Sequence, residues 1–231
     1  MNAALKEDLT KTIHRSAIKS FKDYYEITNG EGWIWNTPEY WYSARIAGAI
    51  GKDFSPKLTP FLEGSVSDFR SYAVTGKRGR PQKKYRSNGR ADIALWTYWK
   101  TNQDWTARAL IEVKKGWSFN KKTHGADLDR LGASLKGTSR KSGQGTVEAG
   151  FFVFMTDDWG NTEKEVRGKL DARAQDMNNK IQTYMDENFG KIRSSYSRKF
   201  SRFYSEDRSL AGSLAACYVF ELNVDERRSR K

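Results

Sequence analysis

Apolar side chains recur every three or four residues in two long segments of the chain, and this period is typical of amphipathic helices. In the first segment, four-residue steps run through Leu5, Leu9, Ile13, Ala17 and Phe21. The second segment, residues 163–189, has the same spacing and carries the strongest helical pattern in the chain. The first pattern predicts a packing helix within residues 1–30, and the second predicts a long helix that ends near Gly190.

Two shorter helices are predicted from local signals. Thr37 is a good N-cap and Pro38 a favourable first helical residue, so a helix is expected from there to about Gly51. Residues 127–135 predict a short helix. Residues 52–88 have a mixed pattern, which indicates a short helix near 60–63 and an extended stretch near 72–75.

Other apolar runs have the character of strands. Residues 90–99 and 105–115 are separated by turn-forming residues and should form a hairpin. The run 148–155 is typical of a buried central strand, and 215–224 should be the last strand. The order of elements predicts an α/β fold in which a mixed central β-sheet is flanked by helices. We expect a single domain over residues 1–231, with its core at 37–225 and a basic tail at 226–231.

The charge of the chain indicates a polyanionic partner. The chain has 41 Lys and Arg against 28 Asp and Glu, which gives a formal net charge of +13. Nucleic acid fits this charge, because each phosphate that Lys or Arg neutralises releases condensed counterions. No apolar run reaches the roughly 20 residues that span a bilayer, and the first residues include no apolar signal segment. We therefore expect a cytoplasmic protein that binds DNA and does not enter a membrane.

The scarcity of cysteine and histidine narrows the chemistry. The only cysteine, Cys217, excludes an internal disulfide framework and a zinc site built from several thiolates. The only histidines, His14 and His124, lie far apart, which counts against nucleases that use histidine as base, nucleophile or ligand. His124, alone in a predicted loop, is expected at the surface. Any metal must therefore be held by carboxylates.

A carboxylate on one strand and a Glu-x-Lys tripeptide on the next supply the groups that metal-assisted phosphodiester hydrolysis needs. Here they are Asp92, Glu112 and Lys114. Carboxylates bind Mg²⁺, and a lysine two residues beyond the glutamate projects from the same face of its strand. Asp92 and Glu112 share a face only if the hairpin loop is odd, with Lys100 opposite Asp104, or if a strand contains a bulge.

These residues resemble the PD-(D/E)XK nuclease superfamily, to which many restriction endonucleases belong. The resemblance covers roughly residues 37–155 and departs from the nominal motif in having Ala91, not proline, before the aspartate. It implies a restriction-endonuclease-like fold. It also implies that Asp92 and Glu112 bind Mg²⁺, for which Mn²⁺ could substitute, that the Val113 carbonyl adds a ligand, and that Lys114 acts on the attacking water.

A fourth residue enters through the same resemblance. Many members of the superfamily have an acid on the helix before the sheet, and Glu39 occupies that place. A carboxylate in the first turn of a helix also suits the helix dipole, so a purely structural role for Glu39 is an equal alternative.

Two basic segments are candidates for nucleic-acid binding. Lys77, Arg78 and Arg80 belong to a short run with an Arg-Gly-Arg-Pro core that resembles an AT-hook, and Lys83 and Lys84 follow. A loop that contacts phosphates without reading bases is the alternative. The second segment mixes Arg198, Lys199 and Arg202 with aromatic residues, which suits contacts with the backbone and stacking on bases. Its aromatic residues could instead be core residues on a helix.

Together these patterns predict a Mg²⁺-dependent endonuclease that hydrolyses DNA phosphodiester bonds. A homodimer would allow both strands to be cut. The alternatives are a non-catalytic DNA-binding protein with a nuclease-like fold and a nuclease that cleaves RNA. The chain has eight tryptophans, several of which cluster at residues 33–41 and 96–105, and all are expected to build the core and the layers that cover the sheet.

Overall fold

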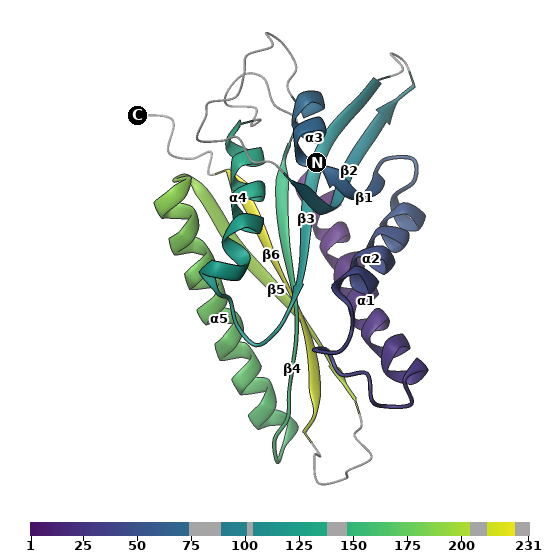
Figure 1. Ribbon diagram of the computed structural model, residues 1–231, viewed down its shortest axis with the longest axis vertical. Helices are drawn as coiled ribbons and strands as arrows, with labels where there is room; N and C mark the ends of the chain where they lie inside the picture. Colours follow the sequence, from purple (N-terminus) through teal and green to yellow (C-terminus); the bar gives the residue numbers. More distant parts are fainter. Residues whose placement is uncertain (74–88, 101–103, 138–146, 204–211, 225–231) are drawn as a thin grey trace.

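A six-stranded sheet runs through the middle of the computed structural model, which describes residues 1–73, 89–100, 104–137, 147–203 and 212–224 (Figure 1). The strands lie in the order β1-β2-β3-β4-β6-β5. Their bounds are β1 (Thr59–Ser65), β2 (Arg90–Trp99), β3 (Asp104–Lys115), β4 (Ala149–Asp158), β5 (Ile192–Arg202) and β6 (Leu214–Val224). Strands β3 and β4 pair in parallel and the other neighbours pair antiparallel, so the sheet is mixed, as predicted.

Helices cover both faces of this sheet. Figure 1 shows α1 (Ala3–Ile27) and α2 (Glu39–Phe54) on one face, and α4 (Lys121–Gly137) and α5 (Glu163–Asn188) on the other. The short helix α3 (Val66–Ala73) packs into the same core as α4 and α5. The predicted apolar stripes of α1 and α5 are buried, so the prediction of an α/β fold with a mixed sheet between helices is confirmed.

The alternation of side chains along β3 divides the interior into two cores. Ile111 and Val113 point into the core beneath α1 and α2. Leu110 points into the core beneath α4 and α5. Glu112, two residues beyond Leu110, projects to that second side, because successive strand residues alternate between faces. A fully buried glutamate therefore lies on the α4 side of the sheet.

Three local predictions were wrong. Residues near 60–63 belong to strand β1, not to a helix, because an edge strand tolerates Pro60 where a central one would not. The described part of 72–75 is helical and belongs to α3, whose Val66, Phe69 and Ala73 form a buried stripe. The basic and aromatic segment after residue 191 forms strand β5, so its alternative reading as a helix is also wrong.

The β2–β3 hairpin contains the bulge that the site requires. Trp99 pairs with Asp104, so the four residues 100–103 lie between the paired ends. The prediction of a three-residue loop closed by Lys100 is therefore wrong. The register then shifts at Leu95/Trp96, because Arg108 is an extra residue in β3. Beyond the bulge Ile93 pairs with Ile111, and continuing this register places Asp92 opposite Glu112. The other predicted condition, a bulge, is the one that the structure satisfies.

Candidate active site

The structure brings all four acidic and basic candidates into one cluster. Asp92 lies at the start of β2, Glu112 and Lys114 lie near the end of β3, and Glu39 begins α2. The Lys114 Nζ lies 3.6 Å from Asp92 Oδ2 and 3.4 Å from Glu39 Oε2. The backbone N–H of Val113 donates to Asp92 Oδ2 at 2.6 Å, which fixes the orientation of that carboxylate.

Two further residues of the cluster, Asp127 and Arg130, were missed by the sequence analysis. The guanidinium of Arg130 donates two hydrogen bonds to the Glu112 carboxylate, from Nε to Oε1 at 2.7 Å and from Nη2 to Oε2 at 3.2 Å. It also donates to Asp127, whose other oxygen lies 3.8 Å from Lys114 Nζ. A spacing of three residues on α4 places Asp127 and Arg130 on one side of the helix. The sequence does contain a pattern that could have identified them. The two charged residues alternate with the apolar positions Leu128 and Leu131 of a predicted helix.

Burial and charge determine the protonation of the cluster. Burial raises the pKa of Glu112 to about 8, although the hydrogen bonds and charge of Arg130 oppose the shift. Burial alone would lower the pKa of Lys114, but Asp92, Asp127 and the other neighbouring carboxylates outweigh it and raise that pKa. Lys114 is therefore a cation at neutral pH, suited to donating hydrogen bonds and not to accepting a proton.

These side chains are suited to binding a divalent cation, although one of the expected metal ligands, Glu112, is hydrogen-bonded to Arg130. Linked by ion pairs, the cluster combines four acids, Glu39, Asp92, Glu112 and Asp127, with two cations, Lys114 and Arg130. It thus has two more acidic than basic groups, and hard carboxylate oxygens are what Mg²⁺ prefers. Among the described residues, no group of three or more His, Cys, Asp or Glu side chains is spaced to hold a metal as it stands. Arg130 uses one acceptor site on each Glu112 oxygen, so a metal between Asp92 and Glu112 would share these oxygens with Arg130 or displace it.

The described residues among those predicted to bind nucleic acid lie away from this cluster. Lys77, Arg78, Arg80, Lys83 and Lys84 fall in 74–88, outside the described residues. Three others, Arg198, Lys199 and Arg202, lie on the edge strand β5, three strand spacings or about 14 Å from β3. Arg198 pairs with Asp171 and Arg202 with Glu163, both acids of α5.

His124 is buried, not at the surface as predicted. Its ring packs near Phe119, Phe152 and Phe154, and its Nδ1 accepts the backbone N–H of Asn120 at 2.9 Å. Burial lowers its pKa. His124 therefore packs at the start of α4 as a neutral ring.

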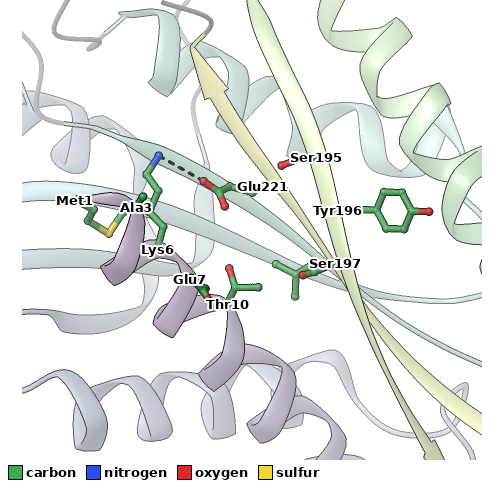
Figure 2. A pocket seen from close by; sticks show the side chains of 10 residues that line it. Met1, Ala3, Lys6, Glu7, Thr10, Ser195, Tyr196, Ser197 and Glu221 are labelled. Carbon is green, nitrogen blue, oxygen red and sulfur yellow. Dashed lines mark ion pairs between the residues drawn. The ribbon is translucent and has the colours of Figure 1, made fainter.

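A hollow of about 420 Å³ lies elsewhere, between the start of α1 and strands β5 and β6. Figure 2 shows Lys6 and Glu221, which line it, paired at 3.4 Å. None of the four predicted catalytic residues lines this hollow, which lies on the α1 side of the sheet. We assign it no part in the site.

The chain was compared with protein-family models, with curated proteins and with solved structures, and none of them matches it. None of the helices in the described ranges is both long and apolar enough to cross a membrane.

Proposed function

We propose that this protein is a metal-dependent endonuclease of the PD-(D/E)XK superfamily that hydrolyses DNA phosphodiester bonds. One observation carries the proposal: a bulge at Arg108 aligns β2 with β3 so that Asp92, Glu112 and Lys114 converge on one face. Charged groups beneath a helical layer are costly to bury, and perturbed pKa values in such a cluster favour a functional origin.

Each residue of the cluster has a distinct role in the proposed reaction. Asp92 and Glu112 would hold Mg²⁺ or Mn²⁺, with the Val113 carbonyl as a further ligand. A bound divalent ion supplies Lewis acidity and makes its water a stronger nucleophile. Lys114, protonated between acids, donates to the attacking water and offsets the charge that builds up on the phosphate. Glu39 accepts from Lys114 and positions its ammonium group.

The catalytic proposal is tested by the nicking of supercoiled plasmid DNA with Mg²⁺. We expect cutting by the wild-type protein, none with EDTA, and a loss of about 100-fold or more in Asp92→Asn and in Lys114→Met. Lys180→Ala is the control, since its ion pair with Asp176 is exposed on α5. Cutting retained in both site variants would refute the assignment.

One observation favours a second candidate, a non-catalytic DNA-binding protein with a nuclease-like fold. Both oxygens of Glu112 are bound by Arg130, and a purely structural cluster would be satisfied in this way. Such a protein would bind DNA without nicking it under any metal. An RNA nuclease would share the chemistry, so the assay includes an RNA oligonucleotide of matched length.

The proposed reaction extends to location and assembly. An enzyme that cuts DNA inside the cell would work in the cytoplasm, which is the location we propose. A homodimer would present two sites for the two strands, and light scattering of the purified protein with and without duplex DNA tests this. A mass of one chain without DNA, and of one chain plus one duplex with DNA, would reject the dimer.

A further inference from the structure

Three exposed tryptophans lie beside the candidate active site. Trp35, Trp117 and Trp159 are 43%, 46% and 37% exposed, although tryptophan is usually highly buried. They come from three separate segments: the link before α2, the residues after β3 and the residue after β4. Tryptophans are predicted to build the core and the layers that cover the sheet, but these three rings are exposed.

The rings contact one another in a continuous surface. Trp159 packs edge-on against Trp35 at 6.3 Å and against Trp117 at 5.4 Å between ring centroids. Trp33 stacks on Trp35 at 4.9 Å and an interplanar angle of 15°, and it is itself held by Phe203. This support from behind keeps the exposed rings in place.

The tryptophan surface and the catalytic cluster lie at the same end of β3. The Nζ of Lys115 donates to the backbone oxygen of Trp35 at 2.5 Å, from the face of β3 opposite to that of Lys114. Trp117 lies three residues after Lys114, a span of at most about 10 Å. Trp35 lies four residues before Glu39. A strand whose phosphate reaches the cluster would therefore carry its neighbouring bases to the tryptophans.

We propose that Trp35, Trp117 and Trp159 form a stacking platform for unpaired bases, so that single-stranded or locally opened DNA is the preferred substrate. This inference rests on the proposed nuclease function and names its substrate class. A nucleic acid suits the surface because the chain has a formal net charge of +13 and because unpaired bases stack on flat aromatic rings. The guanidinium of Arg173, 5.1 Å from the ring centre of Trp117, is paired with Asp158 at 2.6 Å and adds no free charge to this surface. Bases within a duplex already stack on each other, so only unpaired bases offer free faces to the rings.

The test measures binding without cleavage. Fluorescein-labelled thymidine oligonucleotide and a duplex of equal length are titrated in EDTA, with anisotropy giving affinity and tryptophan emission reporting stacking. We expect tighter binding and stronger quenching with the single strand. Trp35→Leu and Trp117→Leu should each weaken single-strand binding roughly tenfold and reduce the quenching. Circular dichroism melts establish that the variants fold, and a variant that does not fold is replaced by Trp159→Leu, which should weaken single-strand binding in the same way.

Trp99→Leu is the matched control, because Trp99 is 47% exposed but lies seven residues along β2 from Asp92, roughly 23 Å away. It should leave affinity unchanged. Equal affinity for duplex and single strand, or full affinity in both folded platform variants, would overturn the proposal. Tryptophan-dependent binding without any Mg²⁺-dependent cutting would instead refute the nuclease function and leave the platform standing. Mg²⁺-dependent cutting by a protein whose platform variants bind normally would refute the stacking platform and leave the nuclease function standing.

Discussion

Replacing Arg130 with alanine tests how the candidate site is held together. Glu112 has no exposed surface, and Arg130 supplies both of its side-chain hydrogen bonds described here, at 2.7 and 3.2 Å. Removing one member of a buried ion pair costs about 3–5 kcal/mol in the free energy of unfolding when the other stays charged. The carboxyl can avoid this cost by taking up a proton.

The cost of Arg130→Ala should therefore depend on pH. In the folded wild type the pKa of Glu112 is about 8, above its ordinary value of 4.5, so the folded state binds a proton that the unfolded state has released. The stability that protonated Glu112 contributes is fully present below pH 4.5 and is lost as pH rises through 8. Without Arg130 this pKa rises further, so the part of the loss that comes from Glu112 should be small well below pH 8 and approach about 3–5 kcal/mol above it, in addition to a loss from the Asp127 contact that does not follow the titration of Glu112.

Urea unfolding followed by circular dichroism measures this difference across pH. The exposed ion-pair variant Lys180→Ala is the control and should be nearly independent of pH in this range. The double variant Arg130→Ala/Glu112→Gln, which removes the charge, should recover stability above pH 8. A loss in Arg130→Ala that equals that of Lys180→Ala at high pH would refute the buried pair.

Two further outcomes are expected. Burial lowers the pKa of His14 to about 4 from 6.5, so the folded state resists a proton that the unfolded state binds, and the contribution of His14 to stability should fall as pH drops from about 6.5 to 4. Glu112 acts in the opposite sense over part of this range, so the His14 contribution is measured as the difference between wild type and His14→Gln in thermal melts; a difference that does not change with pH would rule out His14 as its source. Mg²⁺ should raise the stability of the wild type, by about 2.7 kcal/mol at 100 times its dissociation constant, and not that of Asp92→Asn; an equal rise in both would show that the ion binds elsewhere.

Much of the fold follows from periodicity in the sequence. The four-residue steps of α1 and α5 predict their buried faces, and the run 148–155 predicts β4, every residue of which is buried. Strand β5 was not predicted, because this edge strand at the surface consists largely of serine and basic residues and has few apolar ones. Local propensity cannot reveal that such a segment gains its hydrogen bonds from β6.

The candidate site was predicted only in part. The residues Asp92, Glu112 and Lys114 stand out because they interrupt apolar strands. Their alignment depends on Arg108, an extra residue whose place as a bulge nothing in the sequence marks. Asp127 and Arg130 were missed because charged residues of a helix ordinarily face solvent, whereas here the buried charge of Glu112 draws Arg130 inward. Tertiary pairing, not local pattern, decides such positions.

A crystal soaked in Mn²⁺ and examined by anomalous scattering tests the central claim most directly. The account predicts a peak within about 2.5 Å of carboxylate oxygens of both Asp92 and Glu112. A map with no peak there, and with Arg130 still holding both oxygens at Mn²⁺ concentrations that support DNA cutting, would contradict it.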